Sequence, residues 1–305
     1  MATSVTSPDR VAELPTQSAA RRGSAFLYRH AKVRLALLLS APLFWLGFVY
    51  IAALVALLIT AFWSVDSFTG DIVIDWSFNN VATILTQSVY QAVTLRTLGI
   101  ALVVTAIDIL LALPIAFVMA KVASRSAQRA LVIAILMPLW ASYLVKAYAW
   151  RNVLAEGGIL DWTLGFVGLN SPGYGLEGTV LTLAYLWLPF VILPIYTAME
   201  RVPDSLIDAS SDLGARTWTS FRTVILPLIA PGIIAGSIFS FSLTLGDYIA
   251  VKIVGGATQT LGSLVYTNVG TANNLPLAAA IAFIPIAIIF IYLAAVRRTG
   301  ALNNL

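Results

Sequence analysis

Long apolar stretches, separated by shorter polar ones, make up most of this chain from Leu35 onward. An α-helix rises about 1.5 Å per residue, so about 20 consecutive apolar residues cross a hydrocarbon core of about 30 Å. The stretches long enough to do so lie at residues 35–63, 94–120, 130–153, 179–199, 221–254 and 275–296. We therefore predict an all-α polytopic membrane protein with about six transmembrane helices.

Two of these stretches contain residues that interrupt a helix. Pro138 is expected to break the third, because proline lacks the backbone N–H and clashes with the preceding turn. Gly246 and Asp247 are expected to interrupt the fifth, since glycine weakens a helix and a carboxylate is costly in lipid. Outside the stretches, residues 162–169 predict a short interfacial helix and residues 255–274 a mostly polar connection.

The loops between the stretches alternate in charge. Basic residues gather in residues 1–34, 121–129 and 201–222 and at Arg297-Arg298. The intervening loops carry the acidic residues Asp66, Asp71, Asp75, Glu156, Asp161 and Glu177. Loops rich in Lys and Arg stay in the cytoplasm, so both chain ends and residues 201–222 are predicted to be cytoplasmic. The domains are then a partly disordered cytoplasmic tail (1–34), a transmembrane domain (35–298) and a cytoplasmic tail (299–305).

The composition agrees with a membrane protein. The chain of 305 residues is 59% hydrophobic and 10% charged, whereas soluble domains carry about 25% charged residues. The net charge of +4 follows from the basic loops, so it gives no reason to expect a nucleic-acid partner.

Residue usage excludes several kinds of chemical site. The chain has no cysteine, and its one histidine, His30, lies in the N-terminal tail. Disulfides, thiol nucleophiles and histidine-based metal or catalytic sites are therefore not expected. The Gly-x4-Gly-Lys-Ser/Thr loop that binds ATP phosphates is also missing. We expect no catalytic residue, no metal site and no cofactor bound by this chain.

The polar stretch 202–214 has the local chemistry of a short helix. Asp204 or Ser205 is expected to cap its first turn, and Gly214 to end it in the left-handed conformation. Thr217 is then expected to cap a second helix that runs into the fifth apolar stretch.

The faces of this short helix differ in character. Leu206, Ser210 and Leu213 would form a weakly apolar stripe, while Asp208 and Asp212 lie on another face. A polar helix between membrane spans, in a loop predicted to be cytoplasmic, indicates a docking element for a cytoplasmic partner.

The same stretch resembles a known motif. Asp208-Ala209-Ser210, Gly214 and Val224-Ile225-Leu226-Pro227 resemble the EAA loop of ABC-importer permeases. The family pattern is Glu-Ala-Ala, three residues, Gly, nine residues, Ile, one residue and Leu-Pro. The spacing is kept here, with Asp for Glu, Ser for the second Ala and Val for Ile.

This resemblance implies an ABC type I importer permease fold. In that fold, residues 204–214 would be a coupling helix that seats on an ATP-binding subunit. The implied coupling residues are Asp204, Leu206, Ile207, Asp208, Ala209, Asp212, Leu213 and Gly214.

Two further runs resemble the spermidine/putrescine branch of the family. They are Ser142–Trp150 and Ser242–Tyr248, the second followed by Gly255-Gly256. That branch more often has Arg where this chain has Lys146. Together with the loop motif, the resemblance covers roughly residues 35–298 and implies import of polyamines or a related small cation.

The resemblance also implies partners and a location. The partners are a second homologous permease, two copies of an ATP-binding subunit that holds ATP and magnesium, an external substrate-binding protein and membrane lipids. The location is a bacterial inner membrane, crossed several times.

Ionisable residues inside apolar stretches are the candidates for a transport path. Such groups are costly in a bilayer and mark either a path or a buried pair. The candidate path residues are Asp247, Tyr248, Lys146, Tyr143, Trp150 and Asp108. One alternative is that Asp247 pairs with Lys146 or Lys252 and only holds helices together. Asp108 and Lys146 have the same structural alternative, and Lys252 can instead extend its ammonium to the outer interface.

Other functions remain open at this point. An ion-coupled secondary transporter would use Asp108, Lys146 and Asp247 as a relay. A permease for a sugar, an amino-acid derivative or a metal would share the same architecture. A membrane-embedded enzyme would need clustered nucleophiles, acid pairs or metal ligands, and the sequence has none.

Overall fold

The computed structural model of this protein describes residue 28, residues 31–66 and residues 68–298. The chain forms two compact units, residues 1–57 and residues 58–305. The predictions for the two tails fall outside the described residues, except that a helix begins at Ala31, a few residues before the predicted start.

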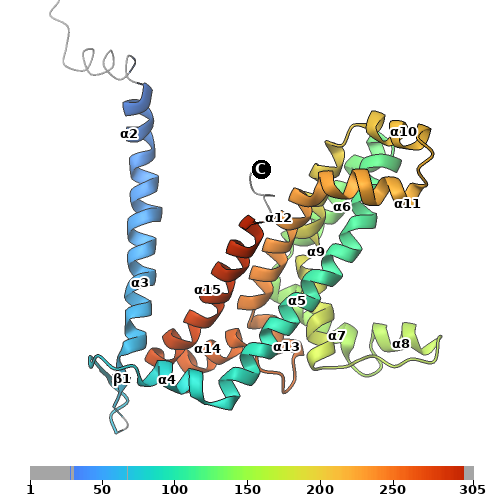
Figure 1. Ribbon diagram of the computed structural model, residues 1–305. Helices are drawn as coiled ribbons and strands as arrows, with labels where there is room; N and C mark the ends of the chain where they lie inside the picture. Colours follow the sequence, from blue (N-terminus) through green and yellow to red (C-terminus); the bar gives the residue numbers. More distant parts are fainter. Residues whose placement is uncertain (1–27, 29–30, 67, 299–305) are drawn as a thin grey trace, which may run out of the picture. The chain divides into compact units, whose positions relative to one another are not determined.

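The described part of the first unit from Ala31 onward is an apolar helix. It consists of α2 (Ala31–Leu43), a π-helical segment η1 (Phe44–Tyr50) and most of α3 (Ile51–Ile59). The helical run Lys32–Phe62 has the length and hydropathy of a membrane span (Figure 1). A helix that is apolar all round needs lipid or another protein to cover it.

The second unit begins with a small hairpin. After η2 (Thr60–Phe62), strands β1 (Ser64–Val65) and β2 (Ile72–Val73) pair antiparallel, with Ser64 opposite Val73. Helix α4 (Asn79–Thr86) follows.

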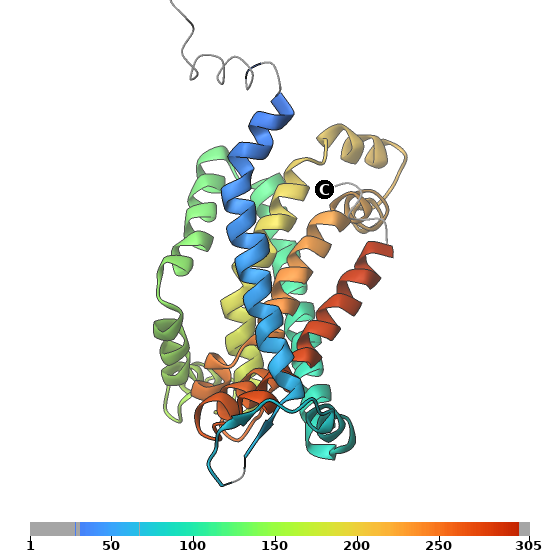
Figure 2. The same cartoon turned by 90° about the vertical axis from the view of Figure 1, so that its left-hand side faces the viewer.

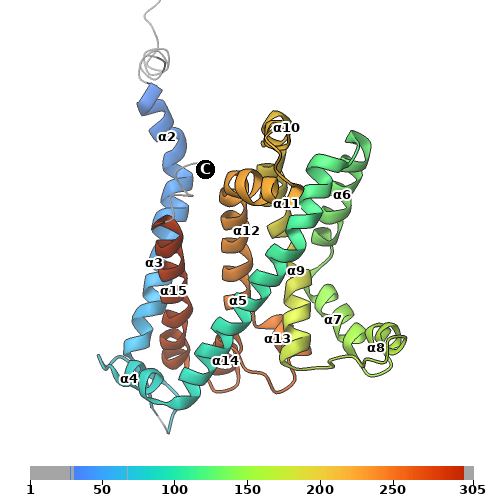
Figure 3. The same ribbon diagram turned by 45° about the vertical axis from the view of Figure 1, so that its right-hand side comes forward.

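Three long helices form the centre of the second unit. They are α5 (Ser88–Phe117), which η3 (Val118–Val122) extends, α9 (Leu176–Glu200) and α12 (Leu226–Gly246), and they pack against one another (Figures 1 and 3). Fully buried side chains from all three form one apolar cluster, which includes Met119, Ile195, Met199 and Ile229.

Two glycines let α12 lie directly on α9. A Cβ atom on Gly232 would stand 2.5 Å from the Cβ of Ala198 and 2.6 Å from the carbonyl oxygen of Pro194. A Cβ atom on Gly236 would stand 3.1 Å from the Cα of Val191. The helices therefore approach each other backbone to backbone at these positions.

The third apolar stretch is broken, but not at the proline itself. Helix α6 (Arg125–Trp140) contains Pro138, and α7 (Tyr143–Leu154) begins after a two-residue break (Figure 2). The helical segments on either side of the break meet at an angle of 96°. The short helix predicted at residues 162–169 is present as α8 (Ile159–Gly165), a few residues earlier than expected.

The fifth stretch is interrupted where the sequence predicted. Helix α11 (Thr217–Ser220) leads through the π-helical η4 (Phe221–Ile225) into α12, which ends at Gly246, and α13 (Ile249–Val254) follows. The connection predicted to be mostly polar contains a helix, α14 (Leu261–Gly270), which begins with a capping box between Thr260 and Ser263.

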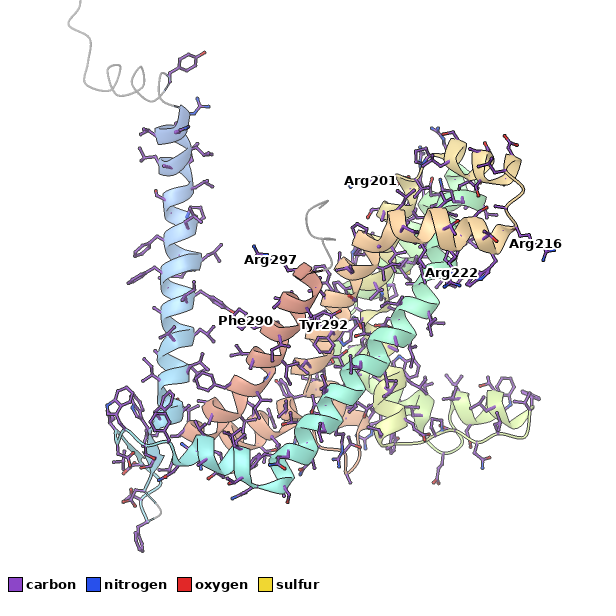
Figure 4. All side chains as sticks on the ribbon, viewed as in Figure 1. Arg201, Arg216, Arg222, Phe290, Tyr292 and Arg297 are labelled. Carbon is purple, nitrogen blue, oxygen red and sulfur yellow. The ribbon has the colours of Figure 1, made fainter. Side chains whose placement is uncertain are left out.

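The last helix, α15 (Leu275–Arg298), completes the second unit. Within the described residues, five helices are long and apolar enough to cross a membrane, or up to six if the bent α6–α7 pair counts as one span. This confirms the prediction of an all-α protein with about six spans. Figure 4 shows Arg201, Arg216, Arg222 and Arg297 at the same end of the second unit.

Candidate functional site

Helix α10 (Asp204–Asp212) occupies the loop that the sequence singled out. It lies beyond the ends of α9 and α12, at the arginine-rich end of the unit (Figure 3). Gly214 has φ +80°, and the backbone N–H groups of Gly214 and Ala215 donate to the carbonyls of Ser211 and Ser210. This is a Schellman ending, so the predicted left-handed stop is confirmed.

The predicted N-terminal caps are wrong. Pro203 occupies the cap position of α10, and neither Asp204 nor Ser205 makes a capping bond because both lie inside the first turn. Arg216 occupies the cap position of α11, so Thr217 is also the first helical residue and does not cap.

The faces of α10 also differ from the predicted stripe. Ser210 is 9% exposed and shares a 2.6 Å hydrogen bond with Ser220 of α11, and Ile207 packs against the central apolar cluster. Leu206 and Leu213, at 43% and 89% exposed, point away from the bundle. The buried face is therefore that of Ile207 and Ser210.

The outward face of α10 combines apolar and acidic side chains. Leu206, Ala209 and Leu213 are exposed at helical spacing, with Asp208 and Asp212 exposed beside them. A monomeric surface rarely keeps such a stripe in water unless another protein covers it. The exposed stripe is a candidate docking face, and Asp204 and Gly214 lie at its two ends.

A second candidate site surrounds Asp247, at the break between α12 and α13. The pocket has a volume of about 300 Å³ and is lined by Tyr143, Trp187, Ser242, Leu243, Gly246, Asp247, Tyr248 and Ile249. Asp247 is only 9% exposed. One of its carboxylate oxygens accepts the Ala250 backbone N–H at 2.9 Å, and the other accepts the Tyr143 hydroxyl.

Aromatic rings form much of the wall of this pocket. The rings of Tyr143 and Trp187 stack with their centroids 5.8 Å apart. Tyr248 stacks on Tyr266 at 4.9 Å. A carboxylate among aromatic faces is suited to an organic ammonium group, because the rings attract cations and the carboxylate accepts N–H hydrogen bonds.

The structure divides the predicted path residues. Tyr143, Asp247 and Tyr248 line the same pocket. Lys146 and Trp150, both partly exposed on α7, are not among its lining residues, and Trp150 packs on Tyr185 at 5.4 Å.

Asp108 lies apart from the pocket, fully buried between α5 and α12. Its Oδ2 accepts the Ser240 hydroxyl at 2.6 Å, and its Oδ1 has no hydrogen-bond partner. Asp108 therefore connects two central helices and does not face Asp247 or Lys146 in this structure.

The lysine pairs considered for Asp247 are not formed within the described part of the chain. The ion pair present there joins Lys121 to Asp204, at 2.6 Å. The Lys252 ammonium instead lies 3.4 Å from the Thr267 hydroxyl and 5.4 Å from the centre of the Tyr266 ring. Asp247 is held by a phenol and a backbone amide.

The sequence did not single out Trp187. It stands in an apolar run of α9 where a lipid-facing tryptophan would look the same. Its role as the neighbour of Tyr143 depends on the break between α6 and α7, which local sequence does not orient. Among the described residues, no group of three or more His, Cys, Asp or Glu side chains is placed to hold a metal.

Comparison with known proteins gives a consistent result. The family described as "Binding-protein-dependent transport system inner membrane component" matches residues 101–299. The inner membrane ABC transporter permease protein YdcU of Escherichia coli K12 is 41% identical over 310 residues, covering 97% of this chain and 99% of that protein. The spermidine/putrescine transport system permease protein PotB of Haemophilus influenzae is 32% identical over 204 residues, covering 65% of this chain and 71% of that protein.

The fold is similar to that of solved transporters. A bacterial ABC transporter involved in the import of the acidic polysaccharide alginate superposes with a TM-score of 0.63 at 16% identity, covering 91% of this chain and 99% of that chain. An inward-facing MetNI methionine ABC transporter gives a TM-score of 0.52 at 18% identity, covering 68% of this chain and 93% of that chain. At these identities the likeness concerns the fold, which is the ABC-importer permease fold that the sequence implied.

Proposed function

This chain belongs to the family of binding-protein-dependent transport system inner membrane components, and from that premise we propose that it carries polyamines or related small organic cations across the membrane. It is a permease subunit of an ABC importer, a transport component and not an enzyme. Family membership favours this mechanism over an ion-coupled secondary transporter.

The pocket around Asp247 is the observation that carries the substrate class. A polyamine presents primary and secondary ammonium groups on a flexible apolar chain. The Asp247 carboxylate and the pocket aromatics Tyr143, Trp187 and Tyr248 offer such groups both charge and ring faces. Each cation–π contact contributes about 0.5–2 kcal/mol. The named substrates of PotB support the same class.

In the proposed cycle, a substrate-binding protein delivers the cation at the end of the molecule that carries the β1–β2 hairpin. The opposite, arginine-rich end faces the cytoplasm, as expected for Lys- and Arg-rich loops. There the exposed face of α10 docks on one of two ATP-binding subunits, which hold ATP and magnesium. A second permease subunit completes the path, and both chain ends are cytoplasmic.

The substitution Asp247→Asn tests the substrate assignment. It keeps the shape and an acceptor for the Tyr143 hydroxyl but removes the charge that an ammonium would contact. We expect uptake at limiting substrate to fall about 10-fold, since a charged hydrogen bond contributes about 1.5–3 kcal/mol. Uptake of labelled putrescine and spermidine is measured in vesicles containing the complete transporter, with the yield of the complex and its basal ATP hydrolysis as controls.

Two results would contradict the proposal. Unchanged uptake by an Asp247→Asn complex of normal yield would remove Asp247 from the path. Uptake of a neutral sugar or of molybdate, without competition by polyamines, would assign the permease to a different substrate class.

A further inference from the structure

Helix α10 is joined to the bundle by a lysine that comes from a distant part of the sequence. The Lys121 ammonium donates to the carbonyl oxygen of Val202 at 2.6 Å and to Asp204 Oδ1 at 2.6 Å. The Lys121 side chain is 11% exposed, whereas that of Asp204 is 80% exposed. The Lys121 ammonium is thus largely enclosed by the protein, and it contacts the first residue of α10.

Lys121 lies on a helical segment that packs in the centre of the second unit. It lies in η3, the continuation of α5, two residues after Met119, which is 1% exposed. Met119 belongs to the apolar cluster that joins α5, α9 and α12, and Val202 belongs to the same cluster. One end of the lysine contact is therefore fixed to the central helices.

The other end of the contact is the exposed first residue of α10, Asp204. Residues 201–203 connect α9 to α10, and Val202 in this connection is packed in the central cluster. By binding the turn carbonyl of Val202 and the first side chain of α10 together, Lys121 restricts the angle between α9 and α10. A displacement of α10 moves the membrane spans only if the angle between α10 and α9 stays fixed.

We propose that Lys121 is a positioning residue that makes α10 move as one body with α5 and α9. The proposal rests on the docking of α10 to the ATP-binding subunit described above. When the ATP-binding subunit displaces α10, this contact passes the displacement to α5, which is part of the membrane-crossing helix Ser88–Val122. Without the contact, the packing of Ile207 and the Ser210–Ser220 hydrogen bond still hold α10, but its first turn loses its side-chain tie to the spans and α10 tilts more easily.

The substitution Lys121→Met tests this role, because it keeps an unbranched apolar stem and removes the ammonium. The complete transporter is assembled in vesicles, and substrate imported per ATP hydrolysed is measured. We expect this ratio to fall about fivefold or more, the lower range of typical coupling between sites, while basal ATP hydrolysis persists. Lys121→Arg, which retains a charged donor, should restore the ratio, and Arg125→Met in the same basic loop should leave it unchanged.

A second variant covers the case in which Lys121→Met does not assemble. Asp204 is exposed, so Asp204→Ala removes one of the two acceptors of the Lys121 ammonium without opening the core. Its ratio should fall by a smaller factor, because Lys121 keeps the Val202 carbonyl. A wild-type ratio in Asp204→Ala, or in an assembled Lys121→Met complex, overturns the proposal.

A cross-link separates this inference from the docking on which it rests. Because the chain has no cysteine, Leu213→Cys places one thiol on the exposed face of α10. A cross-link from this thiol to the ATP-binding subunit is expected in the otherwise native chain and in the Lys121→Met background alike. If the native chain gives no cross-link, docking itself is wrong. If cross-linking persists and the transport ratio is unchanged, only the role of Lys121 is wrong.

Discussion

Asp66 closes the turn of the β1–β2 hairpin with its own side chain. Its carboxylate accepts the backbone N–H of Thr69 at 2.9 Å and that of Phe68 at 2.7 Å. These hydrogen bonds hold the pKa of Asp66 below its ordinary value, and the one from Thr69 has the larger effect. A group whose pKa is lowered by folding stabilises the fold above its unfolded pKa, and that contribution disappears as the pH falls through the folded pKa.

The order of this hairpin should therefore depend on pH only under acid conditions. Protection of the Thr69 amide against hydrogen exchange is expected to stay constant from neutral pH down to about 4, the unfolded pKa of Asp, and to decrease below it. In Asp66→Asn the protection should lose this acid dependence. A decrease that begins between pH 7 and 5 would assign the turn to another titrating group.

At this scale, the sequence predicts what depends on near neighbours. Gly214 was predictable, because a left-handed helix ending needs glycine wherever the helix lies. The capping role of Asp204 was predicted wrongly, because α10 begins at Asp204 and Pro203 occupies the cap position, and the Asp204 carboxylate instead accepts from Lys121, which lies far away in the sequence. The place of Trp187 beside Tyr143 was missed for the same reason, since both come together only through tertiary packing.

Helix packing in the centre of the molecule depends on the missing side chain at Gly232. The nearest atoms to an added Cβ are another Cβ and a backbone carbonyl oxygen, and neither can rotate away. Overpacking of this kind costs about 1–3 kcal/mol.

Gly232→Ala should therefore destabilise the protein although alanine is the better helix former. We expect a lower midpoint of thermal unfolding in detergent for Gly232→Ala than for the native chain. Gly99→Ala is the matched control, because Gly99 lies in α5 and has nothing within 4 Å of an added Cβ. Its midpoint should be unchanged or higher. Equal effects of the two substitutions would show that contact with Ala198 does not limit the approach of α12 to α9.

Elements were predicted where apolar length decides the outcome. The spans and the break after Gly246 follow from hydropathy and glycine chemistry. Helix α14 was not singled out within the polar connection predicted at residues 255–274, because its ten residues are too few to cross a membrane and its start depends on a capping box and on contacts with α15. The helix breaks after Trp140 and not at Pro138. Proline removes one backbone hydrogen bond from the helix, but it does not determine the residue at which the chain turns.

The arrangement of charge over the whole molecule predicts how it lies in the membrane. The chain has no cysteine, so single cysteines report sidedness without background. On intact cells, a thiol reagent that does not cross the inner membrane should label Asp71→Cys on the hairpin but not Ser126→Cys or Ser211→Cys. All three positions are exposed. The opposite labelling pattern would invert the topology and place α10 outside the cytoplasm.

Helix α6 has a consequence for the lipid around the transporter. Its 16 residues rise about 24 Å, less than the hydrocarbon thickness of about 30 Å. The chain then turns by 96° instead of continuing across. A span this short is accommodated by local thinning of the bilayer, by flanking side chains that extend to the interface, or by packing against other protein, at a cost that grows with the mismatch. The acyl-chain length of the surrounding bilayer is thus itself a variable that sets how easily this part of the permease is accommodated.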